Sequence, residues 1–328
     1  MATKIGVNGF GRIGRYLTRI LAGNKNVEVA VINARAGNEE LARLLKYDSV
    51  HRTFQGEVGV WEDGITVCGR KITVTRGGAG EWKWGELGID IVVDTTGKFT
   101  GREQASQHLA CGAKKVIISA PAKNPDCTVV MGVNEKDYDP AAHAIISSAS
   151  CTTNCLAPVA KVLSDAYGIR HGLMTTIHSY TMSQRILDGS HKDPRRARAA
   201  CVSLIPTTTG AARAATLVLP ELKGKLDGYA IRVPTADGSI VDLTLELEKP
   251  VTKEEVNALL KSKANENMGY TEEPLVSVDY LGDTHGGVVD GLLTSVLDNN
   301  MLKVVIWYDN EAGFTWQLVR LIELVAGK

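Results

Sequence analysis

The sequence predicts an α/β protein in which a doubly wound parallel sheet is followed by an α+β domain with a mostly antiparallel sheet. Apolar strands alternate with helical stretches over residues 1–150, which is typical of βαβ units. Over residues 151–313, long strands follow one another with fewer helices between them. A glycine-rich turn near the start joins one strand directly to a helix. We expect two domains, which a chain of 328 residues readily accommodates.

The composition excludes several classes of function. Lys and Arg together number 37, as do Asp and Glu, so the net charge is zero, which argues against a general binder of nucleic acid or membrane surfaces. No apolar run is long enough to span a membrane, and the start of the chain lacks the apolar core of a signal peptide. The six cysteines have no zinc-ligand spacing, so we expect a reduced, cytoplasmic protein without a metal.

The first βαβ unit carries a dinucleotide-binding pattern. A buried strand at residues 4–8 leads into a glycine motif, then a helix at 15–21 and a second strand at 27–32. In this context each glycine has a function: the tight turn, the close approach of a pyrophosphate, and close helix packing. The alternative is a glycine-rich turn without a ligand. The sequence predicts a Rossmann-type site that includes the glycines Gly9, Gly11 and Gly14.

The end of the second strand bears on the choice of cofactor. An NAD site usually has an acidic residue there, bonded to the ribose 2′-hydroxyl. This chain has Ala34 followed by Arg35, so no carboxylate repels a 2′-phosphate and a guanidinium is adjacent to bind one. We expect NAD or NADP as cofactor, with NADP favoured. The alternative is that Arg35 is solvated and the ribose is held more loosely.

The rest of the first half continues the parallel sheet. Strands are expected at residues 89–94 and 115–119, with a helix at 102–113 between them. Ligands of such sheets bind at the carboxyl ends of the strands. Thr96 and Ser119 follow two of these ends, where they are either site residues or turn formers.

Cys151 stands where a strand at residues 144–146 passes into a helix at 156–163. Unpaired N–H groups and the helix dipole favour negative charge at such a position, so we expect a lowered thiol pKa and a reactive thiolate. The alternative, a buried small hydrophobe, is favoured for Cys155, one helical turn further on. The sequence predicts Cys151 as a nucleophile.

The second half supplies further polar groups. A strand at residues 173–180 carries His178, and a basic, loop-like stretch follows at 191–198. Thr209 and Gly210 precede a helix at 211–219, whose N-terminus favours an anion. The remaining elements are strands at 228–233, 240–247, 288–297 and 302–308, and helices that begin with a capping box at 252–255 and at 315.

These residues resemble the phosphorylating glyceraldehyde-3-phosphate dehydrogenase family over essentially the whole chain. The resemblance implies a Rossmann domain over 1–150, a catalytic domain over 151–313, and a C-terminal helix at 314–328 that packs back on the first domain. It also implies a homotetramer. The motifs that match lie at residues 8–14, 45–49, 148–155, 209–212, 232–235 and 307–311.

The resemblance assigns a role to each candidate residue. Cys151 would add to the aldehyde to form a thiohemiacetal, and His178 would be its base. Hydride transfer to the nicotinamide would leave a thioester, which inorganic phosphate attacks. The substrate phosphate would bind Thr181, Arg196 and Arg232, and the attacking phosphate would bind Ser150, Thr152, Thr209 and Gly210. The further cofactor-binding residues would be Arg12, Ile13, Arg76, Ser119 and Asn310.

The chain also departs from the family pattern. Ala34 replaces the usual Asp, Phe314 keeps a ring but lacks the hydroxyl of the usual Tyr, and residues 236–239 differ from the usual Pro-Asn-Val-Ser. Ser190 occupies a position where some NADP-using relatives carry Ser. The alternatives are erythrose-4-phosphate dehydrogenase, a paralogue specialised for arsenate detoxification, and a catalytically silent NAD-binding protein.

Overall fold

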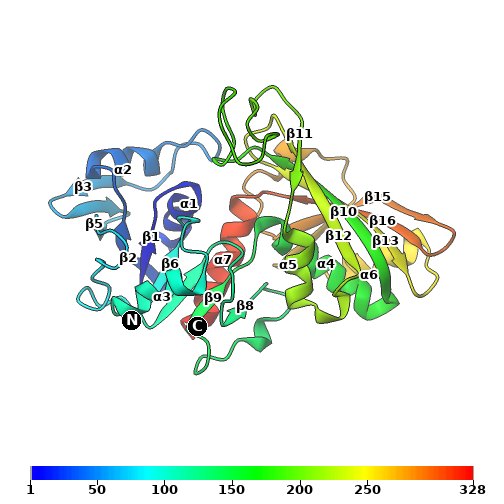
Figure 1. Ribbon diagram of the computed structural model, residues 1–328, viewed down its shortest axis with the longest axis horizontal. Coiled ribbons are helices and arrows are strands. Elements are labelled where there is room, and N and C mark those ends of the chain that lie inside the picture. Colours follow the sequence, from blue (N-terminus) through cyan, green and yellow to red (C-terminus); the bar gives the residue numbers. More distant parts are fainter. Residues whose placement is uncertain (1, 328) are drawn as a thin grey trace. The chain divides into compact units, whose positions relative to one another are not determined.

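The structure, a computed structural model, describes residues 2–327 and divides into two compact units (Figure 1). The first unit holds the chain up to Val129, Glu135–Ala149, and the chain from Leu318 onward. The second holds Val130–Asn134 and Ser150–Gln317. The predicted fold class is confirmed, because one unit is built on a largely parallel sheet and the other on a largely antiparallel one.

The first unit is a nine-stranded sheet with the order β3-β4-β5-β2-β1-β6-β7-β9-β8. All pairs from β5 to β8 are parallel, whereas β3, β4 and β5 pair antiparallel at one edge. The chain order reverses direction at β1, so the carboxyl ends of β1 and β6 flank the point where doubly wound sheets bind ligands. The elements are β1 Thr3–Asn8, α1 Arg12–Leu21, β2 Val27–Asn33, α2 Asn38–Lys46, β3 Val58–Trp61, β4 Gly64–Val67, β5 Arg70–Thr75, β6 Ile91–Asp94, α3 Arg102–Ala110, β7 Lys115–Ile118, β8 Cys127–Thr128, the 3₁₀ turn Glu135–Asp137, and β9 Ile145–Ser147.

Burial explains why these segments are strands. All four residues of β6 are buried, as are the last four of β1, which is expected for parallel strands covered on both faces. Trp82 and Trp84 pack with Val31 and Val92 in one core cluster of this unit. The predicted helix at 102–113 ends earlier than expected, at Ala110.

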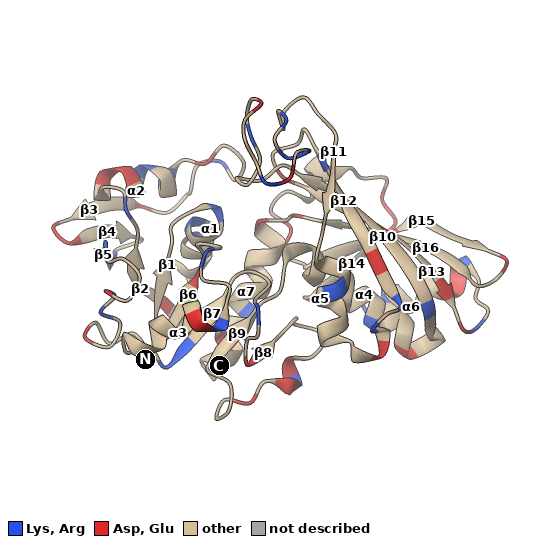
Figure 2. Cartoon of the chain, viewed as in Figure 1, with Lys and Arg blue, Asp and Glu red and all other residues tan. Residues whose placement is uncertain are grey.

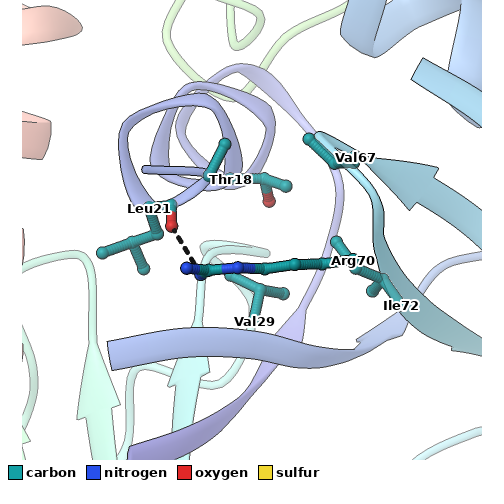
Figure 3. A pocket seen from close by; sticks show the side chains of 7 residues that line it. Thr18, Leu21, Val29, Val67, Arg70 and Ile72 are labelled. Carbon is teal, nitrogen blue, oxygen red and sulfur yellow. Dashed lines mark hydrogen bonds between the residues drawn. The ribbon is translucent and has the colours of Figure 1, made fainter. Parts of the chain in front are cut away.

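A small cavity at the end of α1 shows how this helix is held (Figure 3). The Arg70 guanidinium donates to the carbonyl oxygens of Leu21 and Asn24, at 3.4 and 3.0 Å, so it satisfies acceptors left open at the helix C-terminus. The cavity beside it is only about 10 Å³, room for at most one water molecule. It is therefore a packing feature and no ligand site.

The second unit is a seven-stranded sheet with the order β11-β12-β10-β13-β16-β15-β14, and its long strands run side by side in Figure 1. β10 pairs with β12, and β14 with β15, in parallel; the other pairs are antiparallel. The elements are α4 Cys151–Tyr167, β10 Ile169–Ser179, β11 Ile205–Thr208, α5 Ala211–Val218, the 3₁₀ turn Pro220–Leu222, β12 Leu226–Val233, β13 Ser239–Leu247, α6 Lys253–Ser262, β14 Met268–Thr271, the 3₁₀ turn Ser277–Tyr280, β15 Gly287–Leu297, and β16 Met301–Tyr308. The last helix, α7 Ala312–Val325, begins in the second unit and belongs to the first from Leu318 onward.

The parallel pairing of β10 with β12 places two predicted site residues together. Within this mostly antiparallel sheet, β12 is parallel to β10, since it follows β10 through a crossover that includes α5. In the observed register His178 lies opposite Arg232 at the carboxyl ends of both strands.

Residues of both charge signs are scattered over both units (Figure 2). Across residues 2–327, no helix combines the length and apolar character that crossing a bilayer requires.

Candidate active site

Cys151 and His178 form a close pair in the second unit. Ser150 caps α4, its hydroxyl accepting the N–H of Thr153 at 3.1 Å, so Cys151 becomes the first helical residue. The Cys151 Sγ lies 3.4 Å from Nε2 of His178, near the end of β10. Cys151 is partly exposed, whereas His178 is 4% exposed. This is the arrangement of a thiol nucleophile with a base.

Burial decides the protonation of this pair. It raises the pKa of the Cys151 thiol, although the Arg232 guanidinium and hydrogen bonds from Thr152 act in the opposite direction. Burial also lowers the pKa of His178 to about 3, and the charge of Arg232 adds to that shift. The lowered thiol pKa expected from the helix N-terminus is therefore wrong for the site without ligands. At neutral pH the pair is a thiol beside a neutral imidazole.

Arg232 lies against the other nitrogen of the imidazole. Its Nη1 is 2.7 Å from Nδ1 of His178 and donates to the Ser179 carbonyl oxygen at 2.9 Å, while Nδ1 is itself 2.7 Å from that oxygen. A guanidinium can only donate a hydrogen bond. Nδ1 of His178 therefore either accepts a hydrogen bond from Arg232 or donates its own proton to the Ser179 carbonyl oxygen, but it cannot do both. The Arg232 Nε is buried and has no hydrogen-bond partner within residues 2–327. An incoming anion would satisfy it.

Tyr308 joins three elements of the site, and the sequence analysis did not single it out. Its buried hydroxyl lies 2.9 Å from Thr152 Oγ1 and 2.8 Å from Thr176 Oγ1, and its ring meets His178 edge-on at 5.9 Å. Burial raises its pKa, so it stays a neutral hydroxyl. The Thr152 hydroxyl, predicted to bind the attacking anion, is thus buried and engaged by Tyr308.

The residues predicted for the substrate phosphate are Arg232, Arg196 and Thr181. The charge of Arg196 contributes to lowering the His178 pKa, as does that of Arg232, so both cations act at one site. Arg196 Nε donates to Thr207 Oγ1 at 2.8 Å. Thr181 is partly exposed, and its hydroxyl lies 3.0 Å from Ser183 Oγ.

Thr209 and Gly210 form the start of α5, which packs against α4. The Ala211 N–H donates to Thr209 Oγ1 at 3.2 Å. Gly210 is the exposed N-cap residue, and a Cβ there would meet nothing within 4 Å. The helix N-terminus is therefore open to an anion. The structure gives no contact between this turn and the Cys151 side chain.

A cleft of about 440 Å³ opens in the first unit at the carboxyl ends of β1, β2 and β6. Of the predicted cofactor residues, it is lined by Gly9, Ala34, Arg35, Arg76 and Thr96. The lining residues that the sequence analysis did not assign are Asn8, Phe10, Asn33, Ala36, Leu41, Leu44, Gly77, Gly78, Ala79, Trp82, Lys98 and Phe99.

The glycine motif fits a dinucleotide. Gly9 has φ +95°, and a Cβ there would meet Thr96 at 2.8 Å. A Cβ on Gly14 would collide with the Gly9 carbonyl oxygen. Gly11 is the N-cap of α1, no side chain caps this helix, and the space beside Gly11 is open. The N-terminus of α1, which begins with Arg12 and Ile13, thus has the uncapped helix geometry that suits a pyrophosphate.

Six predicted cofactor residues lie outside the lining of this cleft: Gly11, Arg12, Ile13 and Gly14 at the start of α1, and Ser119 and Asn310. Arg12 forms a bidentate pair with Asp48, with one contact of 2.9 Å. The Ser119 N–H donates to the Asp94 carbonyl oxygen at 3.0 Å. Asn310 belongs to the second unit, where its Oδ1 accepts from Ser239 Oγ at 2.6 Å.

Two arginines that line the cleft, Arg76 and Arg35, differ in whether the side chain is hydrogen-bonded within the protein. Arg76 Nη2 donates to the Ala36 carbonyl oxygen at 3.0 Å and to Asn38 Oδ1 at 2.8 Å. Arg35 is exposed and makes no hydrogen bond within the described chain. The guanidinium beside Ala34 is therefore free to bind a ligand.

A sheet with a dinucleotide cleft and a close cysteine–histidine pair define the class of NAD(P)-dependent oxidoreductases that work through a thiol. Residues 3–102 match the family described as glyceraldehyde 3-phosphate dehydrogenase, NAD binding domain, and residues 150–310 match the C-terminal domain of the same enzyme. The chain belongs to the glyceraldehyde-3-phosphate dehydrogenase family.

Curated relatives are similar over the full length. A glyceraldehyde-3-phosphate dehydrogenase of Geobacillus stearothermophilus is 57% identical over 333 residues, covering 100% of this chain and 99% of the relative. Glyceraldehyde-3-phosphate dehydrogenase 1 of Bacillus subtilis is 54% identical, with the same coverage. A glyceraldehyde-3-phosphate dehydrogenase of Streptomyces coelicolor is 50% identical and covers both chains completely.

Proposed function

We propose that this protein is a phosphorylating glyceraldehyde-3-phosphate dehydrogenase of the cytoplasm, acting in glycolysis. The observation that carries the proposal is the 3.4 Å approach of Cys151 Sγ to His178 Nε2, with Arg232 directly beside the imidazole. A nucleophile, a base and a cation for the substrate phosphate thereby meet at one point. The family membership supports the same reaction.

The reaction follows from these groups. The sulfur of Cys151 bonds to the aldehyde carbon as the thiol proton passes through His178 to the carbonyl oxygen, which gives a thiohemiacetal. His178 then takes the hydroxyl proton as the C–H bond breaks, and the carbon becomes a thioester. The nicotinamide, when bound, accepts the hydride. A phosphate oxygen attacks the thioester, the C–S bond breaks, and the acyl phosphate leaves with Cys151 restored.

The two anions have separate positions in this proposal. Arg232, Arg196 and Thr181 hold the phosphate of the aldehyde: Arg232 lies against the imidazole, and the charges of both arginines lower the pKa of His178. Ser150, Thr209 and Gly210 hold the attacking phosphate at the N-termini of two packed helices. Thr152 contributes through its hydrogen bond to Tyr308, which steadies the start of α4.

We propose that the enzyme accepts NADP at least as readily as NAD. The cleft has no carboxylate at Ala34, and the exposed, unpaired Arg35 can bind a 2′-phosphate. Ser119 and Asn310 are proposed to contact the nicotinamide end.

We also propose a homotetramer. The segment between β10 and β11 exposes apolar side chains that a single chain leaves in water: Met182 is 88% exposed, Ile186 81% and Val202 80%. Leu173 on β10 and Tyr229 on β12 are exposed on the sheet itself. Large apolar side chains exposed to this degree favour burial in a contact with another chain. Sedimentation equilibrium should give four chains per particle, and a monomer at micromolar concentration would contradict this proposal.

Initial rates test the activity and its alternatives. With glyceraldehyde 3-phosphate, cofactor reduction should require phosphate, and arsenate should replace it. Erythrose-4-phosphate dehydrogenase would prefer the four-carbon aldehyde and proceed without phosphate, and a silent binding protein would reduce no cofactor. A specialised arsenate enzyme would prefer arsenate to phosphate.

A further inference from the structure

His108 is a fully buried imidazole in the first unit that the proposed chemistry does not use. It lies on α3, its Nδ1 is 3.1 Å from Trp84 Nε1, and its Nε2 is 3.3 Å from Asp94 Oδ2. An indole N–H can only donate, so Nδ1 must be the acceptor. The neutral ring therefore carries its proton on Nε2 and donates it to Asp94. The hydrogen bond from Trp84 therefore favours the tautomer with the proton on Nε2, the nitrogen that faces the Asp94 carboxylate.

The Asp94 carboxylate also accepts hydrogen bonds from two residues that line the cleft. Its Oδ1 accepts from the backbone N–H and the hydroxyl of Thr96, at 3.0 and 2.7 Å. Its Oδ2 accepts from Asn8 Nδ2 at 2.7 Å in addition to His108. Four donors thus converge on one buried carboxylate, which fixes the orientation of Thr96 and Asn8. Both of these residues line the cleft.

The relay continues to the next strand. Asn8 Oδ1 accepts from Asn33 Nδ2 at 2.8 Å, and the same nitrogen donates to the Gly77 carbonyl oxygen at 3.1 Å. Thr75 closes the chain by donating to Asn33 Oδ1 at 3.0 Å. Asn33 and Gly77 also line the cleft. Hydrogen bonds therefore connect the imidazole to the carboxyl ends of β6, β1, β2 and β5.

The imidazole also supports the aromatic wall of the cleft. Its ring stacks on Trp82 with centroids 4.0 Å apart, and it meets Phe99 edge-on at 5.6 Å. Trp82 and Phe99 both line the cleft. An apolar residue at position 108 could fill this space, but it would leave the Trp84 N–H and one lone pair of Asp94 unsatisfied.

We propose that His108 is a positioning residue for the nicotinamide cofactor: through Asp94 it orients Asn8, Asn33 and Thr96 along the cleft. This inference depends on one part of the proposed function, namely that the nicotinamide cofactor binds in this cleft. His108 touches no reacting atom, so its removal should weaken cofactor binding and leave the thiol site of the second unit unchanged.

The experiment compares His108→Leu and His108→Gln in the full chain. The Gln carboxamide can both donate to Asp94 and accept from Trp84, whereas Leu can do neither. We expect His108→Leu to raise the Kd of NAD and NADP by about tenfold or more, because it removes a buried hydrogen bond to the charged Asp94 carboxylate. His108→Gln should restore most of the affinity. The alkylation rate of Cys151 should stay as in the wild type, and His143→Leu, outside the relay, is the matched control.

Trp84→Phe gives a second route, because it keeps an aromatic ring but deletes the N–H that selects the tautomer, together with part of the buried indole. It should raise both Kd values by a smaller factor, about threefold, on the same physical ground. The positioning role would be overturned if folded His108→Leu bound NAD and NADP with the Kd values of the wild type. If His108→Leu does not fold, wild-type Kd values in Trp84→Phe would overturn it. A wild-type protein that binds cofactor but oxidises no aldehyde would instead contradict the proposed function and leave this inference testable by binding.

Discussion

The Sγ of Cys151 and the Nε2 of His178 lie 3.4 Å apart, and burial favours the neutral form of each. The resting site is therefore a thiol next to an imidazole, not a preformed thiolate. Its reactivity depends on the imidazole receiving the thiol proton at the moment when the sulfur attacks.

The alkylation of Cys151 should depend on His178. In His178→Asn the sulfur loses the acceptor of its proton, so iodoacetamide labelling at pH 7.5 should fall by about tenfold and its pH profile should shift upward. His171→Asn, an exposed position on the same strand, is the matched control. An unchanged profile in His178→Asn would show that the two residues are not coupled.

Stability in acid should also depend on His178. Its pKa is about 3 in the folded protein and has an ordinary value of 6.5. Between these values the unfolded chain binds a proton that the folded chain does not, so the free energy of unfolding falls as pH drops from about 6.5 toward 3. The loss is on the order of a few kcal/mol for one strongly shifted group. His178→Asn should lose less stability between pH 7 and 5 in urea titrations, and an equal loss would contradict the assignment.

The turn before α5 should discriminate between the two anions. Thr209→Ala should raise the KM for inorganic phosphate by about tenfold, as for loss of one hydrogen bond to a charged group, with little change for the aldehyde. Thr216→Ala is the control, because its hydroxyl bonds to the Arg213 carbonyl within the same helix. Equal changes in both KM values would refute the separation into two anion sites.

Arg35 should set the cofactor ratio. A single charge-assisted bond to the 2′-phosphate contributes about 1.5–3 kcal/mol, so Arg35→Ala should lower kcat/KM for NADP by about tenfold or more while sparing NAD. Arg43→Ala, an exposed arginine on α2, is the matched control. Strong preference of the wild type for NAD, or an unmoved ratio in Arg35→Ala, would rule out this cofactor argument.

Local patterns account for what the sequence could predict. The strand–glycine–helix order predicts α1 and its open N-terminus, since both depend on neighbouring residues. The strand-to-helix transition likewise predicts that Cys151 lies just before a helix, expected at 156–163. The helix α4 in fact begins at Cys151, because Ser150 caps it.

Long-range packing accounts for what the sequence could not predict. The partner of Thr152 is Tyr308, 156 positions away, and the partner of Arg12 is Asp48. The direction of the Cys151 pKa shift depends on how deeply the folded chain buries the sulfur, so the helix dipole alone predicts the wrong sign. The parallel register of β10 and β12, which brings Arg232 to His178, follows from a crossover and leaves no local signal.

The central claim is that Cys151 carries the acyl group between oxidation and phosphate attack. The most direct measurement mixes the enzyme with glyceraldehyde 3-phosphate and oxidised cofactor in phosphate-free buffer, follows cofactor reduction, and locates the adduct by mass spectrometry. The account predicts a burst of one reduced cofactor per chain, an acyl group on Cys151, and its release on adding phosphate, with no burst in Cys151→Ser. Sustained turnover without phosphate or arsenate, or a burst that persists in Cys151→Ser, would contradict it.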